Sequence, residues 1–291
     1  MKSVKDEYKK YLQTISGTEI YNNFKEILYS KNDSLVSYFN NEILKEILPE
    51  QNQIKICDIG GGDAKRLKSI GSFLTGFDSN RNLSLDIIEQ SREFCSQAKM
   101  NLSKNNPFYK VNIFNQLFEN YSTDSKYNLI FLIHSIFAFQ DTNSIIKVFN
   151  SLAEDGKVIL FSNAPDSFLA TLKQLIDAHF KDTRFEINEI ENLLLKSEVD
   201  FDKYQFDTEW AVKSNEFETK MELILEWLSL GHFKNFSSKQ KSKMFNKIID
   251  LSYYKDGSYL FKEKEEILSI PFDSKLLQQG FLHSFSESEN I

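Results

Sequence analysis

Three consecutive glycines follow a short apolar run in the stretch "IKICDIGGGDAKRL", and acidic side chains flank them. Gly60, Gly61 and Gly62 stand between Asp58 and Asp63, in a chain that has only 10 glycines among its 291 residues, so the run is a concentrated feature. Glycine has no Cβ, and its backbone can approach a ligand more closely than that of any other residue. The flanking carboxylates favour a cationic ligand over a polyanion. The stretch therefore predicts a turn that holds a positively charged molecule against the main chain.

Two phosphate-binding interpretations of these glycines fit less well. A P-loop requires Gly-Lys-Ser/Thr, but Gly62 is followed by Asp63. A dinucleotide fingerprint requires a third glycine where Lys65 stands, and Asp58 and Asp63 would repel a pyrophosphate. S-adenosylmethionine fits better, because it carries a sulfonium and an ammonium and no phosphate. A turn without any ligand is less favoured, since three glycines in a row cost backbone entropy.

An acidic residue also ends the next apolar run, "LDIIEQS". Glu89 at the end of a second strand can accept hydrogen bonds from both ribose hydroxyls of a nucleoside. Its distance from the glycines exceeds the usual spacing of about 20 residues, which the loop "TGFDSNRN" explains. A solvated residue at a helix start is the alternative. Together with the glycines, Glu89 favours a nucleoside-containing cofactor.

The elements around these residues alternate between apolar strands and amphipathic helices. This alternation predicts a Rossmann-like α/β fold with a seven-stranded, mostly parallel sheet and helices on both faces. Residues 1–49 are expected to form an N-terminal helical cap that contributes to the substrate pocket, and residues 50–291 the cofactor-binding domain with further pocket elements in 165–270. Strands are expected at 53–59, 82–89, 107–114, the first half of 127–139, 157–163, 202–212 and 257–270, and helices at 91–102, 143–154, 167–180, 187–198, 218–230 and 238–254.

Composition excludes several classes of function. The net charge is −7 and no dense basic block interrupts the chain, which argues against a nucleic-acid partner. No stretch approaches the roughly 18 to 20 apolar residues that span a bilayer.

The N-terminus lacks the apolar core of a signal peptide, and Cys57 and Cys95 suit buried free thiols, so we expect a cytoplasmic protein. The scattered histidines show no metal-ligand spacing, and we expect a monomer.

Several motifs resemble those of class I S-adenosylmethionine-dependent methyltransferases. "CDIGGGDA", "LDIIEQS" and "YNLIFLIHSIFAF" look like the first, second and fourth strand motifs of that family, over residues 50 to 165. Within it, the whole chain looks most like the histamine N-methyltransferases. The resemblance implies the class I methyltransferase fold. It also implies that Gly60 lines the methionine part of the cofactor, Glu89 holds the ribose, Ile133 walls the cofactor, and Asn115 or Gln116 lies near the adenine.

The same resemblance suggests where a substrate would bind, and where this chain departs from the family. Glu19 of a Thr-Glu pair takes the place of the family's substrate carboxylate, and Phe137 that of a pocket aromatic. His134 replaces a glutamine, and Glu263 replaces an asparagine that meets the substrate; an exposed position for Glu263 is the alternative. Phe168 is a further aromatic that could wall a flat cation. The predicted cofactor-binding set comprises Asp58, Gly60, Gly61, Gly62, Glu89, Gln90, Asn115, Gln116 and Ile133.

We therefore expect an S-adenosylmethionine-dependent methyltransferase that acts on a nitrogen of a small amine or imidazole-containing acceptor. His134, at the end of an apolar strand, is the candidate catalytic residue that orients or deprotonates the nucleophile; a packed histidine with one hydrogen bond is its alternative role. A short peptide is also a possible acceptor. The alternatives are an O-methyltransferase of a small metabolite or peptide, and a catalytically silent binding protein with the same fold.

Overall fold

The chain divides into two compact units, each made of separate stretches of sequence. The computed structural model describes residues 15–48, 51–136, 139, 142–177 and 187–272. Unit 1 comprises Met1–Ser37, Asn163–Thr183 and Gln205–Glu265, and unit 2 comprises Tyr38–Ser162, Arg184–Tyr204 and Glu266–Ile291. The expected N-terminal cap is thus divided between the units after Ser37. Its contribution to a substrate pocket stays a prediction.

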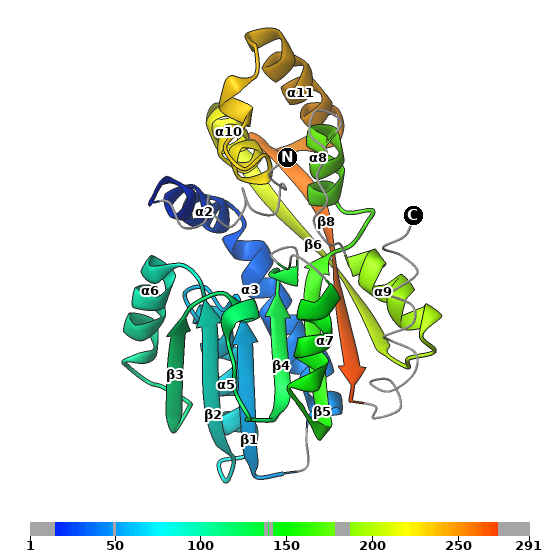
Figure 1. Cartoon of the computed structure of the whole chain (residues 1–291). Helices are drawn as coiled ribbons and strands as arrows, with labels where there is room; N and C mark the ends of the chain where they lie inside the picture. Colours follow the sequence, from blue (N-terminus) through cyan, green and yellow to red (C-terminus); the bar gives the residue numbers. More distant parts are fainter. Residues whose placement is uncertain (1–14, 49–50, 137–138, 140–141, 178–186, 273–291) are drawn as a thin grey trace. The chain divides into compact units, whose positions relative to one another are not determined.

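Unit 2 is built on five parallel strands whose neighbours pair in register (Figure 1). They are β1 (Gln53–Ile59), β2 (Asn82–Glu89), β3 (Lys110–Asn115), β4 (Tyr127–Ile133) and β5 (Leu152–Asn163). The strand order in the whole sheet is β3-β2-β1-β4-β5-β8-β6, in which β6 (Asp202–Lys213) and β8 (Ser258–Pro271) each contribute residues to both units. The predicted Rossmann-like α/β fold is confirmed. Because the strand order reverses between β1 and β4, their carboxyl ends border the crevice where such folds bind ligands.

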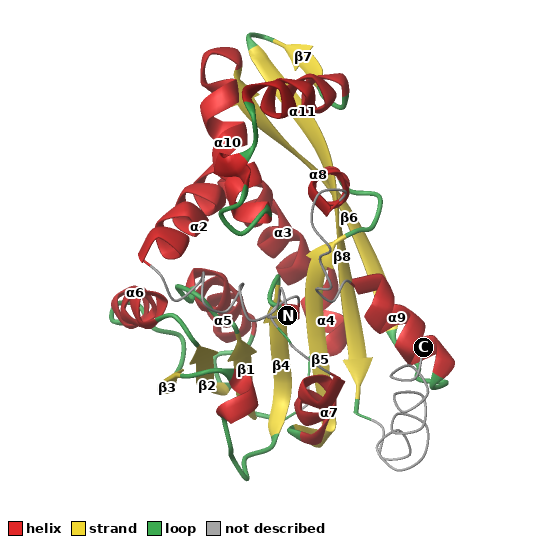
Figure 2. Cartoon of the chain, turned by 45° about the horizontal axis from the view of Figure 1, so that its top comes forward, coloured by secondary structure: helices red, strands yellow, loops and turns green. Residues whose placement is uncertain are grey.

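Helices cover both faces of the unit 2 sheet. Figures 1 and 2 show α5 on one side of the parallel strands and α7 on the other. The helices of this unit are a π-helical turn (Phe39–Ile43), α4 (Leu44–Ile47), α5 (Lys65–Phe77), α6 (Arg92–Leu102), α7 (Thr142–Asn150) and α9 (Ile187–Lys196). On one face, Phe39 packs edge-on against Phe131 and Phe161. On the other, residues of α7 and α9 join Ile130 and Leu160 in one core cluster. Both faces are therefore buried, as near-continuous apolar strands require.

A buried polar network ties the start of β4 to the middle of β2. The Tyr127 hydroxyl donates to Oδ2 of Asp86 at 2.8 Å and lies 2.8 Å from the Tyr121 hydroxyl. Oδ1 of Asp86 accepts from the Asn112 side-chain amide at 2.6 Å. Asp86, Tyr121 and Tyr127 are all buried. Each polar atom of this network thus gains a partner that compensates for its lost water.

Phenylalanine in place of Tyr127 should lower the free energy of unfolding by about 1 to 3 kcal/mol, because the buried Asp86 carboxylate loses a donor. Urea unfolding followed by circular dichroism measures the change. Tyr254→Phe is the matched control, since the Tyr254 side chain is 60% exposed and its hydroxyl can remain in water. A loss below about 0.5 kcal/mol for Tyr127→Phe would mean that the network adds little to stability.

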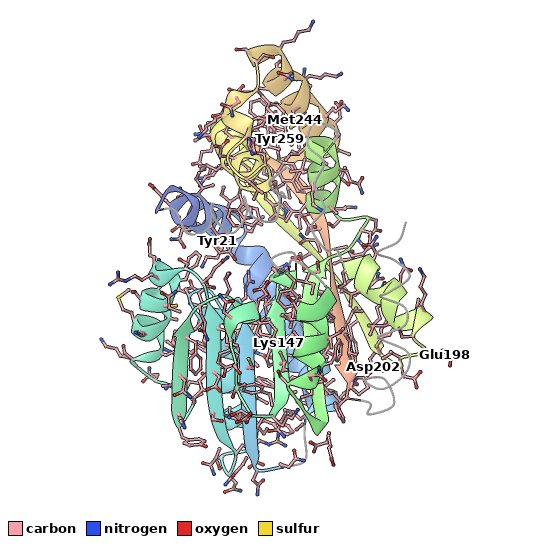
Figure 3. All side chains as sticks on the ribbon, in the orientation of Figure 1. Tyr21, Lys147, Glu198, Asp202, Met244 and Tyr259 are labelled. Atoms are coloured by element: carbon pink, nitrogen blue, oxygen red, sulfur yellow. The ribbon has the colours of Figure 1, made fainter. Side chains whose placement is uncertain are left out.

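Unit 1 packs helices around parts of β6 and β8 and has its own aromatic core. Its helices are α2 (Ile15–Ile27), α3 (Tyr29–Tyr38, which ends in unit 2), α8 (Phe168–Asp177), α10 (Phe217–Leu228) and α11 (Ser238–Asp250). The Trp210 and Phe261 rings stack with centroids 4.4 Å apart. Met244 and Tyr259, labelled in Figure 3, belong to the same core region. None of the helices in the described ranges is long and apolar enough to cross a membrane.

One predicted boundary in unit 1 is wrong. The helix expected to continue to Tyr254 ends at Asp250, and a short strand, β7 (Tyr253–Lys255), pairs antiparallel with β8. Asp256 and Gly257 connect the two strands with φ angles of +49° and +78°. Two successive positive φ angles are what a two-residue type I′ hairpin requires, and Asp-Gly is a preferred pair for it. The Asp-Gly signal therefore outweighs the helical spacing before it.

Candidate functional site

The glycine turn after β1 has a left-handed backbone and little space around two of its three residues. Gly60 and Gly62 have φ angles of +72° and +54°. A Cβ built on Gly60 would lie 2.6 Å from the Ser135 Cβ, and one on Gly61 would lie 2.5 Å from Oδ2 of Asp58. A Cβ on Gly62 would meet no protein atom within 4 Å. The protein itself thus excludes side chains at the first two glycines, and only Gly62 faces open space.

Asp58 lies beneath this turn and is almost completely buried. Its side chain is 1% exposed, and its Oδ1 atom has no hydrogen-bond partner among the described residues. Burial raises the pKa of Asp58 to about 8, and the nearby Glu89 carboxylate adds to the shift, while Arg66 opposes it. Without a ligand, Asp58 is therefore mostly protonated at neutral pH. A cation placed next to it would favour the ionised form.

Glu89 ends β2 and is bound to the glycine turn by its side chain. Oε2 accepts from the Gly62 N–H at 3.0 Å, and Oε1 accepts from the Ser91 N–H at 2.7 Å. The side chain is buried, so these two bonds hold it in one place. A carboxylate oxygen can accept more than one hydrogen bond. Glu89 is thus oriented at the ends of the strands, next to the glycine turn.

The end of β3 is hydrogen-bonded to the end of β2. The Asn115 side-chain amide donates to the carbonyl oxygens of Glu89 at 3.1 Å and Gln90 at 2.9 Å. The Gln116 N–H also donates to the Glu89 carbonyl, at 3.1 Å. The structure therefore brings the predicted residues of β1, β2 and β3 together at the carboxyl ends of the strands. Strand β1 pairs with β2 on one side and with β4 on the other, and Ile133 is the last residue of β4.

The segment after β4 carries His134, whose backbone is strained. His134 has a φ of +52°, which is uncommon for a residue with a side chain. Its N–H donates to the Phe161 carbonyl at 3.0 Å, which continues the pairing of β4 with β5. The hydroxyl of the next residue, Ser135, donates to the Ile59 carbonyl at 2.6 Å. Non-glycine residues in this region of φ cluster at functional sites, and His134 fits that pattern.

The predicted substrate residues that the structure describes belong to unit 1. Glu19 is exposed on α2. Phe168 is buried in the aromatic core, where its ring lies edge-on to that of Trp210. Glu263 is 2% exposed and its Oε2 accepts from the Leu169 N–H at 3.3 Å, so the alternative of an exposed Glu263 is wrong. Phe137 lies outside the described residues, and the substrate roles of all four stay predictions.

Ser135 is the residue of this region that the sequence did not single out. It is 76 positions from Ile59, and no motif links an isolated serine after an apolar strand to the glycine turn. The described ranges also contain no group of three or more His, Cys, Asp or Glu side chains arranged to hold a metal ion.

Comparison with known proteins gives matches among structures only. Neither a protein-family model nor a curated protein matches the sequence. A proposed methyltransferase from Bacillus halodurans matches with a TM-score of 0.55 and 12% identity over 79% of this chain and 97% of that chain. The YcgJ protein of Bacillus subtilis matches with a TM-score of 0.54 and 11% identity over 81% and 98%. The plantazolicin methyltransferase BamL, in complex with a triazolic desmethylPZN analog and SAH, matches with a TM-score of 0.51 and 12% identity over 92% and 96%. With the strand order and the turn after β1, these matches show that the chain has the fold of the class I S-adenosylmethionine-dependent methyltransferases.

Proposed function

We propose that this protein is an S-adenosylmethionine-dependent methyltransferase that methylates a nitrogen of a small amine or imidazole-containing acceptor. The observation that carries the proposal is the pair of buried carboxylates, Asp58 and Glu89, at the adjacent carboxyl ends of β1 and β2 around the glycine turn. Two buried acids so close to each other favour a ligand that brings positive charge.

The residues present fit the cofactor part by part. Oδ1 of Asp58 is buried beside the turn and can accept from an ammonium, which would also lower the pKa of Asp58. The open space at Gly62 leaves room for the ligand along the main chain. Glu89, fixed by two N–H donors, can accept from ribose hydroxyls. Asn115 or Gln116 is proposed to lie near the adenine, and Ile133 to wall the cofactor.

When bound, S-adenosylmethionine supplies a methyl group on a positively charged sulfur. The new N–CH₃ bond forms as the S–CH₃ bond breaks, the electron pair of the broken bond stays on sulfur as a thioether, and the acceptor nitrogen sheds a proton. The chain's part is to hold both reactants in line and free of water, which lowers a barrier by about 7 to 11 kcal/mol in well-oriented systems. His134 is the proposed acceptor for the proton, directly or through water.

The second part of the proposal is that the methyl acceptor is a cation. It rests on the sequence resemblance to the histamine N-methyltransferases and on the two acidic candidates, Glu19 and Glu263. Glu263 is buried next to the start of α8, and the proposal assigns its carboxylate to a substrate ammonium. The plantazolicin methyltransferase BamL is in complex with a triazolic desmethylPZN analog, so larger molecules, including short peptides, are also among the acceptors to be tested.

Calorimetric titration with S-adenosylmethionine tests the cofactor, and we expect micromolar binding at pH 8. No heat at millimolar ligand would contradict the proposal. The acceptor is tested by incubating the protein and cofactor with amines, imidazoles, amino acids and short peptides, and by mass spectrometry for the gain of one methylene mass. If every product were methylated on oxygen, the protein would be an O-methyltransferase and the proposal of N-methylation would be wrong. Cofactor binding without turnover on any acceptor would favour a silent binding protein.

A further inference from the structure

Ser135 contacts the glycine turn in two ways that are independent of each other. Its hydroxyl donates a 2.6 Å hydrogen bond to the carbonyl of Ile59, the last residue of β1. Its Cβ occupies the space that a side chain on Gly60 would need, because a Cβ there would lie 2.6 Å away. Ser135 is 6% exposed, so water does not compete strongly for the hydroxyl. The left-handed conformation of Gly60 is thus supported from the β4 side by a bond and by a close contact.

The same short segment fixes His134. The His134 N–H is bound to Phe161 on β5, and Ser135 is bound to β1, on the other side of β4. Between these two attachments, His134 keeps a φ of +52°. A strained conformation persists only where neighbouring contacts determine it. The hydrogen bonds of the His134 N–H and of the Ser135 hydroxyl hold His134 in this conformation.

We propose that Ser135 is a positioning residue that fixes the cofactor turn and the His134 segment against each other. This inference rests on the proposed function, since it assigns Ser135 a role in holding the methyl donor at the distance from His134 that transfer requires. Ser135 need not touch the cofactor or the acceptor. It acts through Gly60 on one side and through His134 on the other.

The test is the affinity for S-adenosylhomocysteine, measured by calorimetry. Ser135→Ala keeps the Cβ and removes the hydroxyl, and should weaken binding about fivefold, which corresponds to one lost hydrogen bond. Gly60→Ala should weaken it more than tenfold. Adding Ser135→Gly to Gly60→Ala removes the clashing Cβ, and the double variant should bind more tightly than Gly60→Ala alone although it lacks the Ser135 hydroxyl. Such non-additive behaviour is what direct contact between two residues produces.

Two controls separate positioning from general stability. Tyr127→Phe removes a buried hydroxyl in the same unit at the start of β4, and should leave S-adenosylhomocysteine affinity within twofold. Gly62→Ala places alanine on the same left-handed backbone without a clash, so its unfolding temperature should fall by less than that of Gly60→Ala. The difference should shrink when Ser135→Gly accompanies Gly60→Ala, because the clash is relieved although the Ser135 hydroxyl is also lost. The His134 imidazole resonances, assigned with His134→Gln, should shift in Ser135→Ala.

The outcomes are distinguishable. Wild-type protein that does not bind S-adenosylhomocysteine overturns the proposed function. Wild-type protein that binds it, together with an unchanged affinity in Ser135→Ala or additive effects of Gly60→Ala and Ser135→Gly, overturns the positioning role of Ser135 alone.

Discussion

Asparagine in place of Asp58 should stabilise the ligand-free protein and weaken its cofactor binding at the same time. The pKa of Asp58 is raised from 3.8 to about 8, so between these values the folded state holds a proton that the unfolded state has lost. Stability therefore falls as pH rises through this window, and the cost is fully present above pH 8. Asparagine carries no charge at any pH. Asp58→Asn should gain about 2 to 5 kcal/mol over wild type at pH 8 and little at pH 4.

The effect on binding has the opposite sign. A cationic cofactor favours the ionised carboxylate, so wild-type affinity should rise from pH 6 to pH 8, by up to about tenfold per unit. Asp58→Asn should bind S-adenosylmethionine about 10- to 100-fold more weakly at pH 8, because the buried partner charge is gone. Its affinity should also no longer depend on pH in this range. Denaturant unfolding and calorimetry at several pH values measure both effects, and equal pH profiles for the two proteins would contradict the assignment.

Glutamine in place of Glu89 should abolish most cofactor binding while leaving the fold intact. Both oxygens of Glu89 accept from backbone N–H groups, of Gly62 and Ser91. An amide group can accept with only one of its two ends, so one of these N–H donors would face an NH₂ group and lose its partner. The turn would lose its attachment to β2, or α6 its start, together with the negative charge. We expect the dissociation constant for S-adenosylmethionine to rise by about 100-fold.

Glu93→Gln is the matched control for Glu89→Gln, because Glu93 is an exposed acid only four residues later. Its affinity for the cofactor should equal that of wild type. Calorimetry gives both constants, and circular dichroism shows whether each variant is folded. A Glu89→Gln protein that binds within threefold of wild type would remove Glu89 from the cofactor site.

The arrangement of residues around the glycine turn could largely be predicted from the sequence, because the information is local. The apolar runs 53–59 and 82–89 match β1 and β2 in full, since buried parallel strands read as continuous apolar stretches. Glycines after the first strand and an acid at the end of the second then lie at one edge of the sheet by the geometry of parallel strands. This is why Asp58, Gly62 and Glu89 meet in the structure.

The remaining features depend on contacts between distant residues. Nothing near Ser135 in the sequence indicates that its Cβ fits against Gly60, 75 positions earlier. Glu263 lies in the charged run "FKEKEEI", where local composition favours exposure, yet the structure buries it against the start of α8. The high pKa of Asp58 follows from its burial, which a strand-end position alone does not determine. Tertiary packing overrides composition at each of these positions.

The division of unit 1 into three stretches has a consequence for how the protein is made. In unit 1, Tyr21 on α2 packs against Trp227 on α10, with ring centroids 4.5 Å apart. During synthesis α2 leaves the ribosome about 200 residues before this partner, which takes about 10 to 40 s at usual rates of translation. Unit 2 has by then most of its strands available for pairing. The apolar side of α2 is therefore exposed to non-native contacts until α10 emerges. We expect soluble expression of the protein to depend on chaperones that bind exposed apolar segments.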